Sequence, residues 1–528
     1  MTAFVTAARV ARLRARIPFL RPRRPRPAGP PSVAGSLLRL SLALAIAYGA
    51  LASGLAYWQV VEAQRLTTDP LNPLVLAAAR NAPRGTIFDA GGNVLARTVS
   101  SGGEQLRDYP YLVAAPVVGY RSNIFGTAGL ERTYDGQLTG LISLRPGDEL
   151  LRKFNGQTYN PSDLVTSLNI ELQRVATDLL GNQRGAIVAL EPGTGRVLAL
   201  ASSPTFNPNR VVDPRDGRRY VAELQGRDDS PLLNRATQGL YVPGSVFKIA
   251  TAIAGLGSGA ISTETTFPGQ PEEYRTGFLV EGFRIHDFPR RVQLDDPLDF
   301  DEATEVSSNI WYAHAGLQAG PEPLRDFTSR LGFGQRIPFE LPTSPSQLNG
   351  GDGPLLGFRD SVELANAAYG QGEVLVTPLQ MALVAATVAN NGQLMKPKLV
   401  DEVRAADGSV TSLGPSALTQ VVSPSVAQEI LQAMQQAVEG RFALASGAKV
   451  SGVPTAGKSG TAELGEGESP HSWFIGLAPA DAPRIAIAVI VEGGGAGAQR
   501  AVPMGGQLMS AYLDLSAESS AAWAAVSR

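Results

Sequence analysis

The chain has 528 residues, of which 46 are lysine or arginine, 48 are aspartate or glutamate and 3 are histidine, so its formal net charge is −2. This length predicts more than one domain, and the nearly balanced charge indicates no class of partner by itself. The absence of cysteine excludes disulfides, zinc–thiolate sites and cysteine nucleophiles, and a chain of this size can be stable without disulfides.

Residues 1–39 form a basic segment that contains nine arginines and no acidic residue. Prolines are frequent in it, and such a composition cannot bury a core, so we expect a disordered tail. A basic tail can bind nucleic acid. Because a long apolar run follows directly, we interpret this tail as the cytoplasmic flank of a membrane span and expect no nucleic-acid partner.

Residues 40–61 contain no charged side chain and are long enough to cross a bilayer, which takes about 20 apolar residues. Tyr57 and Trp58 fit an interfacial belt at the far end. A cleaved signal peptide is the alternative, since Ala50-Leu51-Ala52 resembles a cleavage site. Apolar residues continue past that site, which favours an uncleaved anchor with the N-terminus in the cytoplasm and everything after Glu62 outside.

Residues 62–162 read as a separate, β-rich module. A predicted strand ends at Asp89, a Gly-rich turn follows at residues 90–93, and a second strand covers Val94 to Val99. No catalytic constellation is visible in this module.

Residues 163–528 show a different pattern. The predicted elements are a strand at 164–168, a helix at 170–180, a hairpin of 185–190 with 196–201, a strand at 484–491 and a helix at 505–515. Strands at both ends with helices between them predict an α+β domain whose first and last strands share a sheet.

Ser245 follows the chain-breaking pair Pro243-Gly244 and begins an apolar helix predicted to reach Leu256. Lys248 lies one turn further on, so its amine can fold back beside the Ser245 hydroxyl. Burial disfavours the charged form of a lysine, and a neutral lysine beside a serine is a general base beside a nucleophile. An isolated S-x-x-K pattern is weak, because Ser245 could simply cap the helix.

Two further motifs support the catalytic interpretation. Ser307 and Asn309 form an S-x-N motif that can relay a proton and bind a peptide amide, although it could also cap the following helix. Lys458-Ser459-Gly460-Thr461 supplies a cation, a glycine that lets substrate backbone approach, and hydroxyls that can hold a carboxylate. In this order, the three motifs are the set of penicillin-binding proteins and class A β-lactamases.

The sequence resembles the class B penicillin-binding proteins, which are monofunctional and membrane-anchored, over most of its length. The stretches that carry this resemblance, besides the three motifs, are Arg84–Asp89, Gly129–Glu131, Gly193–Ala199, Gly370–Gly372, Thr377–Gln380 and Trp473–Gly476. The resemblance implies a transpeptidase domain at 163–528, made of a sheet flanked by helices and shared with serine β-lactamases. It also implies a pedestal at 62–162 and the D,D-transpeptidase activity that cross-links peptidoglycan.

The resemblance also implies a role for each site residue. Ser245 attacks the stem peptide and Lys248 takes its proton, while Ser307 and Lys458 deliver a proton to the leaving amine. Asn309 holds the substrate amide. Backbone N–H groups of Ser245 and Thr461 form the oxyanion hole. The residues expected to bind substrate are Lys458, Ser459, Gly460 and Thr461, and of these Lys458 and Thr461 hold its carboxylate.

The implied partners are peptidoglycan stem peptides, as D-Ala-D-Ala donor and amine acceptor, and β-lactams, which imitate the donor. A separate membrane glycan polymerase is expected, because the 62–162 module is too short to be one. No metal or organic cofactor is implied. Val242 stands where relatives often have a second proline, and Ser459 replaces a commoner threonine; neither change removes a reacting group.

Three alternatives remain to be tested. Residues Gly452 to Ser459 match the phosphate-binding loop pattern, but the residues after them do not predict the required helix. A Ser-His-Asp hydrolase would need one of His286, His314 and His471, and no G-x-S-x-G surrounds Ser245. A β-lactamase or penicillin sensor shares the three motifs, but we find no group that activates water and no signalling domain.

Overall fold

The structure is a computed structural model that describes residues 32–62, 84–101, 104–140, 160–288, 296–351, 353–465 and 467–526. Most of the predicted basic tail and parts of the predicted pedestal lie outside these residues. The chain forms two compact units, residues 1–77 and 78–528.

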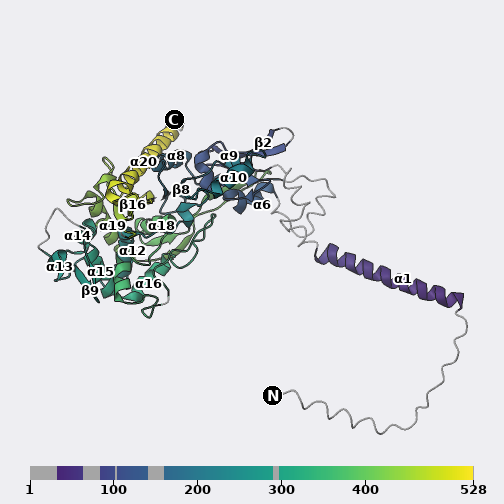
Figure 1. Ribbon diagram of the computed structural model, residues 1–528. Helices are drawn as coiled ribbons and strands as arrows, with labels where there is room; N and C mark the ends of the chain where they lie inside the picture. The colour runs from purple at the N-terminus through teal and green to yellow at the C-terminus, as the bar shows by residue number, and fades with distance from the viewer. Residues whose placement is uncertain are drawn as a thin grey trace, which may run out of the picture. The chain divides into compact units, whose positions relative to one another are not determined.

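The first unit contains one long apolar helix. Helix α1 covers Val33–Ala56 and continues into a π-helical turn at Tyr57–Val61 (Figure 1). Ser32 caps its start, where the Oγ atom accepts a hydrogen bond from the Gly35 N–H at 3.1 Å. By length and composition the helix can cross a membrane, and none of its most apolar stretch is buried. The predicted span at 40–61 lies within it.

The second unit is organised around a five-stranded antiparallel sheet in the order β15-β16-β17-β7-β8. The strands are Ala456–Ala462 (β15), His471–Ala478 (β16), Ile485–Val491 (β17), Gly185–Leu190 (β7) and Val197–Ser203 (β8). β7 pairs with β17, so the predicted hairpin and the predicted strand at 484–491 share this sheet. The strand predicted first in the domain, at 164–168, lies instead in a second sheet, where it pairs with the strand at Ile87–Phe88. β15 is an edge strand, and its free edge faces the predicted site.

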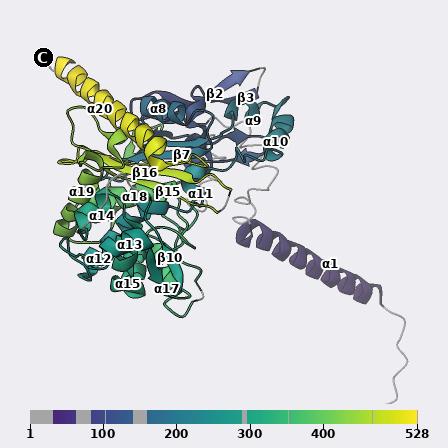
Figure 2. The same ribbon diagram turned by 60° about the vertical axis from the view of Figure 1, so that its left-hand side comes forward.

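Helices cover both faces of this sheet (Figure 2). Ile187 and Ala189 of β7 pack with α8 (Ile170–Leu180) and α20 (Ala501–Val526). The alternate residues of β7 belong to the larger core that contains the other helices. Those helices are α12 (Lys248–Ser258), α14 (Phe300–Glu305), α15 (Asn309–Ala319), α16 (Pro321–Arg330), α17 (Ser361–Ala368), α18 (Pro378–Ala389) and α19 (Pro424–Glu439).

Helix α20 begins at Ala501, four residues before the predicted start at Gly505. Pro503 lies in its first turn, where proline is tolerated because no N–H is needed there. Gly505 serves packing instead, since a Cβ at this position would lie 2.2 Å from Phe474 of the sheet.

A second, six-stranded sheet has the order β13-β12-β6-β1-β2-β3. Its strands are Ile87–Phe88 (β1), Val94–Ser101 (β2), Glu104–Asp108 (β3), Asp163–Thr166 (β6), Val400–Arg404 (β12) and Val410–Ser412 (β13). The predicted pair of strands around residue 90 is therefore present. β12 joins from a point more than two hundred residues later and pairs antiparallel with β6.

Beside this sheet lies a buried cluster of charges, which we call the pedestal clasp: Arg84, Arg107 and Glu131. The fully buried Glu131 carboxylate accepts hydrogen bonds from Arg84 Nε and Arg107 Nε, each at 2.6 Å. Burial alone would raise the pKa of Glu131, but the two guanidinium groups outweigh it and hold that pKa below its usual value. Two of the stretches that carry the family resemblance, around Arg84 and Glu131, thus meet in one structural ion-pair cluster.

Candidate active site

Ser245 lies in a 3₁₀ turn, Gly244–Phe247, that leads directly into α12. Its side chain is 6 % exposed, and Lys248 is fully buried one turn on. The turn depends on two glycines. Gly244 has φ +56°, and a Cβ there would lie 2.5 Å from the Thr461 carbonyl oxygen. A Cβ at Gly370 would lie 1.9 Å from the Gly244 carbonyl oxygen, and the Gly244 N–H donates to Gly370 O at 2.8 Å.

The Lys248 amine points toward the S-x-N motif. Lys248 Nζ donates to the Ser307 carbonyl oxygen at 2.8 Å and to Asn309 Oδ1 at 2.8 Å, and it lies 3.3 Å from Ser307 Oγ. The first two motifs predicted from sequence are therefore one connected group.

Ser307 occupies a strained backbone conformation with φ +59°, where a non-glycine residue costs about 1–3 kcal/mol. It sits between the end of α14 and the start of α15. This conformation presents both the carbonyl and the hydroxyl of Ser307 to Lys248. Strain of this kind persists only where surrounding contacts hold it, and it is frequent at active sites.

Lys458 reaches the same hydroxyl from the opposite side. Its Nζ lies 2.7 Å from Ser307 Oγ and donates to the Ser459 carbonyl oxygen at 3.1 Å. Lys458 is 1 % exposed, and among the described residues no carboxylate forms an ion pair with it. Burial therefore lowers the pKa of Lys458 to about 7, so this amine can exchange a proton near neutral pH.

The third motif lies on the edge strand β15. Gly460 faces the Ser245 turn, where a Cβ would lie 3.0 Å from the Val246 side chain. Thr461 Oγ1 accepts a hydrogen bond from the Gly497 N–H at 3.1 Å. One lone pair of this hydroxyl is thereby occupied, and its proton is available for an anionic ligand.

All residues predicted for the site therefore gather at one place: Ser245, Lys248, Ser307, Asn309, Lys458, Ser459, Gly460 and Thr461. Three supporting residues of the site were not predicted from the sequence. Gly370 is given above only as part of the resemblance, and no role was predicted for Gly497 or Asp287. The close approach of the Gly497 backbone to β15 explains that glycine, because a Cβ would lie 2.2 Å from Gly460 O.

The alternative sites do not fit the structure. The apparent phosphate-binding pattern ends inside β15 rather than in a loop before a helix. His314 is packed against Phe278 and hydrogen-bonded to Glu273 at 2.7 Å, whereas His471 borders the site on β16, with its ring 5.5 Å from that of Tyr241. The described residues contain no group of three or more His, Cys, Asp or Glu side chains that could hold a metal.

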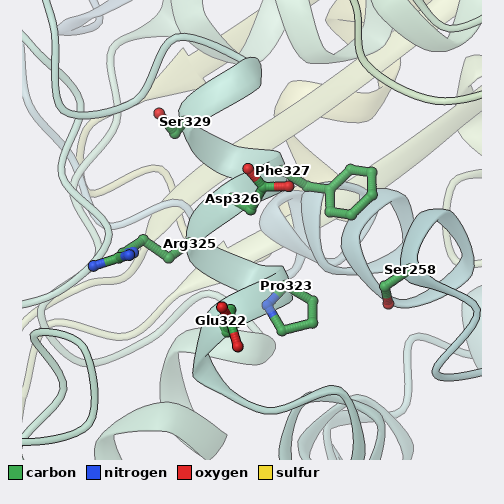
Figure 3. Close-up of a pocket in the computed structure, with 7 residues that line it drawn as sticks. All are labelled: Ser258, Glu322, Pro323, Arg325, Asp326, Phe327 and Ser329. Atoms are coloured by element: carbon green, nitrogen blue, oxygen red, sulfur yellow. The ribbon is translucent and has the colours of Figure 1, made fainter.

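A cavity of about 560 Å³ beside α16 lies among residues outside the three motifs, as Figure 3 shows. It is lined by Ser258, Glu322, Pro323, Arg325, Asp326, Phe327 and Ser329. Because none of these is a predicted site residue, the chemistry is assigned to the motif cluster and not to this cavity.

Comparison with known protein families gives two matches, which both lie within the second unit. Residues 185–510 match the penicillin binding protein transpeptidase domain, and residues 84–163 match the penicillin binding protein A dimerisation domain. The peptidoglycan D,D-transpeptidase PbpA of Mycolicibacterium smegmatis is 34% identical over 504 residues, which cover 90% of this chain and 99% of that protein.

The chain is also similar to solved structures of penicillin-binding proteins. The ceftriaxone acyl-enzyme complex of penicillin-binding protein A from M. tuberculosis is 31% identical, with a TM-score of 0.72 over 83% of this chain and 99% of that chain. The imipenem acyl-enzyme complex of that protein is 33% identical, with a TM-score of 0.70 over 83% of this chain and 100% of that chain.

Proposed function

The chain belongs to the penicillin-binding protein transpeptidase family, and from this we propose that it is a D,D-transpeptidase that cross-links peptidoglycan stem peptides and is inhibited by β-lactams. The observation that carries the proposal is the convergence of two buried amines, Lys248 and Lys458, on the Ser307 hydroxyl beside the Ser245 turn. A relative with the same fold, penicillin-binding protein A of M. tuberculosis, forms acyl-enzymes with β-lactams.

The first step forms the acyl-enzyme. The Ser245 oxygen attacks the carbonyl carbon of the penultimate D-Ala, and neutral Lys248 takes the hydroxyl proton as general base. The backbone N–H groups of Ser245 and Thr461 are proposed to stabilise the negative charge that develops on the carbonyl oxygen. Gly370 and Gly460 support this arrangement, because they let the Ser245 turn approach its neighbours closely.

The tetrahedral intermediate then loses the terminal D-Ala. Protonated Lys458 delivers its proton through the Ser307 hydroxyl, 2.7 Å away, to the leaving amine as the carbon–nitrogen bond breaks. The acyl-enzyme next reacts with an amine of a second stem peptide. The amine nitrogen attacks the acyl carbon and loses a proton through Ser307 to the now neutral Lys458. As the ester carbon–oxygen bond breaks, protonated Lys248 returns its proton to the Ser245 oxygen.

The free edge of β15 suits an extended substrate. A stem peptide can add to it by backbone hydrogen bonds, with its terminal carboxylate held by Lys458 and the Thr461 hydroxyl. Ser459 and Gly460 line that edge. Asn309 can bind the substrate amide with its remaining donor and acceptor, since Oδ1 already accepts from Lys248 and Nδ2 donates to His286 O at 3.0 Å.

We propose that α1 anchors the chain in the cell membrane, with the N-terminus in the cytoplasm and the catalytic unit outside. The basic composition of residues 1–39 supports this orientation. The pedestal at 62–162 and the transpeptidase domain at 163–528 remain our proposed boundaries, and a separate membrane glycan polymerase is the proposed partner.

Labelling of the full-length protein in detergent with a fluorescent penicillin tests the proposal. We expect a stable adduct that mass spectrometry locates on Ser245 and that the Ser245→Ala variant lacks. Rapid release of the label would indicate a β-lactamase instead. A folded protein that takes up no label would overturn the assignment.

A further inference from the structure

Asp287 lies outside the three motifs, yet its carboxylate binds the S-x-N turn. Oδ1 accepts from the Asn309 N–H at 2.5 Å and from the Ile310 N–H at 3.1 Å, and Oδ2 accepts from the Ser308 hydroxyl at 2.9 Å. The residue follows strand β10 (Phe283–Ile285) and comes twenty-one residues before Ser308 in the chain.

These contacts complete the N-terminus of helix α15. The first N–H groups of a helix have no partner within it. Here Asp287 takes the first two, from Asn309 and Ile310, and the Ser308 hydroxyl accepts the third, from Trp311, at 3.1 Å. A carboxylate at this end is also favoured by the helix dipole. Asp287 and Ser308 thus form a two-residue cap in which the serine hydroxyl donates to the aspartate.

The cap is attached directly to the reacting groups. Ser307, at φ +59°, immediately precedes Ser308, and this strained conformation presents its carbonyl to Lys248. The Ser307 hydroxyl lies 2.7 Å from Lys458 Nζ. If the first turn of α15 frayed, Ser307 could relax to a common conformation, and the contact shared by the two lysines would be lost.

The neighbouring residue on the same segment orients the amide of the motif. The His286 carbonyl accepts from Asn309 Nδ2 at 3.0 Å, which directs Oδ1 toward Lys248 Nζ at 2.8 Å. The two-residue segment 286–287 therefore contacts every member of the S-x-N motif except Ser307, and it holds Ser307 through its neighbour.

We propose that Asp287 is a positioning residue for the transpeptidase reaction: its carboxylate locks the turn from Ser307 to Asn309 in the geometry in which both lysines share the Ser307 hydroxyl. The inference rests on the proposed function, because it assigns these groups to acylation. Asp287 acts through Ser307 and Asn309, and contact with substrate is not required.

The test compares Asp287→Ala, Asp287→Asn and the control Asp299→Ala in full-length protein. Asp299 is a matched control, because it caps the adjacent helix α14 by accepting from the Glu302 N–H at 2.9 Å, and within the described part of the chain no hydrogen bond joins its side chain to a site residue. Acylation by penicillin is followed at several concentrations, so that the binding constant and the acylation rate constant are separated, and thermal unfolding is measured for each variant.

We expect Asp287→Ala to lower the acylation rate constant about 100-fold with little change in binding, because a small displacement of a reacting group is enough for such a loss. Asp287→Asn keeps one acceptor oxygen and should therefore retain more of the acylation rate than Asp287→Ala. If the alanine variant does not fold, the asparagine variant still tests the role of Asp287. Asp299→Ala should lower the melting temperature and leave acylation unchanged.

Acylation at the wild-type rate in a folded Asp287→Ala or Asp287→Asn protein would overturn the inference. A loss of rate in Asp299→Ala as large as that in Asp287→Ala would also overturn it, because the effect would then be one of helix stability. If the wild-type protein itself takes up no penicillin on Ser245, the proposed function fails rather than the role of Asp287.

Discussion

Two regions of the molecule bury cations in opposite ways. In the pedestal clasp, Arg84 and Arg107 are buried against a carboxylate that lies between them, at 2.6 Å from each. At the active site, Lys458 is equally buried, and its hydrogen-bonding partners among the described residues are a hydroxyl and a backbone carbonyl. In the clasp, a carboxylate offsets the positive charge of the arginines. At the active site, burial favours the loss of a proton from Lys458.

A neighbouring carboxylate decides whether a buried cation forms a structural ion pair or becomes a reactive amine. In the clasp, the attraction of two arginines lowers the pKa of Glu131, so this buried carboxylate stays charged at neutral pH. Without a carboxylate, burial instead lowers the pKa of Lys458 to about 7. An amine in that range can donate and accept protons under physiological conditions, whereas a guanidinium cannot.

The largest effect should come from removing an amine at the site. Lys248→Ala should reduce the rate of penicillin acylation by about 10²–10⁴-fold, because the general base is lost, while thermal unfolding remains cooperative. Stopped-flow labelling measures the rate. Acylation at the wild-type rate would show that Lys248 is not the base.

Removing the acid of the clasp should instead damage folding. Glu131→Ala leaves two buried arginines without a partner and should destabilise the protein by about 3–5 kcal/mol. Denaturant unfolding measures this loss. The matched control is Asp135→Ala, which removes the half-exposed partner of Arg84 and should cost about 1 kcal/mol or less. If Glu131→Ala and Asp135→Ala lowered the free energy of unfolding equally, the buried carboxylate would contribute no more than the half-exposed one.

Replacing the Lys458 amine should raise the stability of the protein, whereas replacing Glu131 lowers it. The folded pKa of Lys458, about 7, lies below its usual 10.5, so below about pH 7 the folded state bears the full cost of protonating a buried amine, and this cost declines as pH rises toward 10.5. Lys458→Met should therefore stabilise the protein by about 1–3 kcal/mol at neutral pH and lower the acylation rate by about 10²-fold.

Lys449→Met is the control for this change, since Lys449 is a half-exposed lysine beside Glu439. We expect its effect to stay within about 0.5 kcal/mol. A Lys458→Met protein that unfolds more readily than wild type would show that the buried amine stabilises the fold.

The smallest expected effect is on the pH profile. If protonated Lys458 supplies the proton for the leaving amine, the second-order rate of acylation should fall as pH rises through about 7, by up to about tenfold per unit. Lys458→Arg keeps the charge but cannot give up a proton, so it should lower the rate at every pH and remove this alkaline fall. A wild-type rate that stays level or rises between about pH 7 and pH 9 would contradict the role of Lys458 as proton donor.

Local patterns were sufficient to predict the three motifs and three strands of the main sheet, β7, β8 and β17, whereas β15 and β16 were not predicted. Helix α12 and strands β7 and β17 follow from apolar runs and turn residues, and the resemblance brought Ser245, Lys248 and Lys458 together before any geometry was known. Asp287 could not be predicted in its role, because a carboxylate that caps a helix from another segment has no local pattern. The clasp was equally hidden, since Arg107 lies in no recognised motif.

The pairing of β12 with β6 has a consequence for how the molecule is made. Val400 lies opposite Thr166 in this ladder, so the six-stranded sheet cannot be completed until the chain has been synthesised past residue 412. Until then β6 presents an unpaired edge, which is a template for aggregation, and such long-range pairing forms slowly. A fragment that ended just after Thr166 would keep that edge permanently, whereas one that also carried residues 400–412 as a second segment would close it.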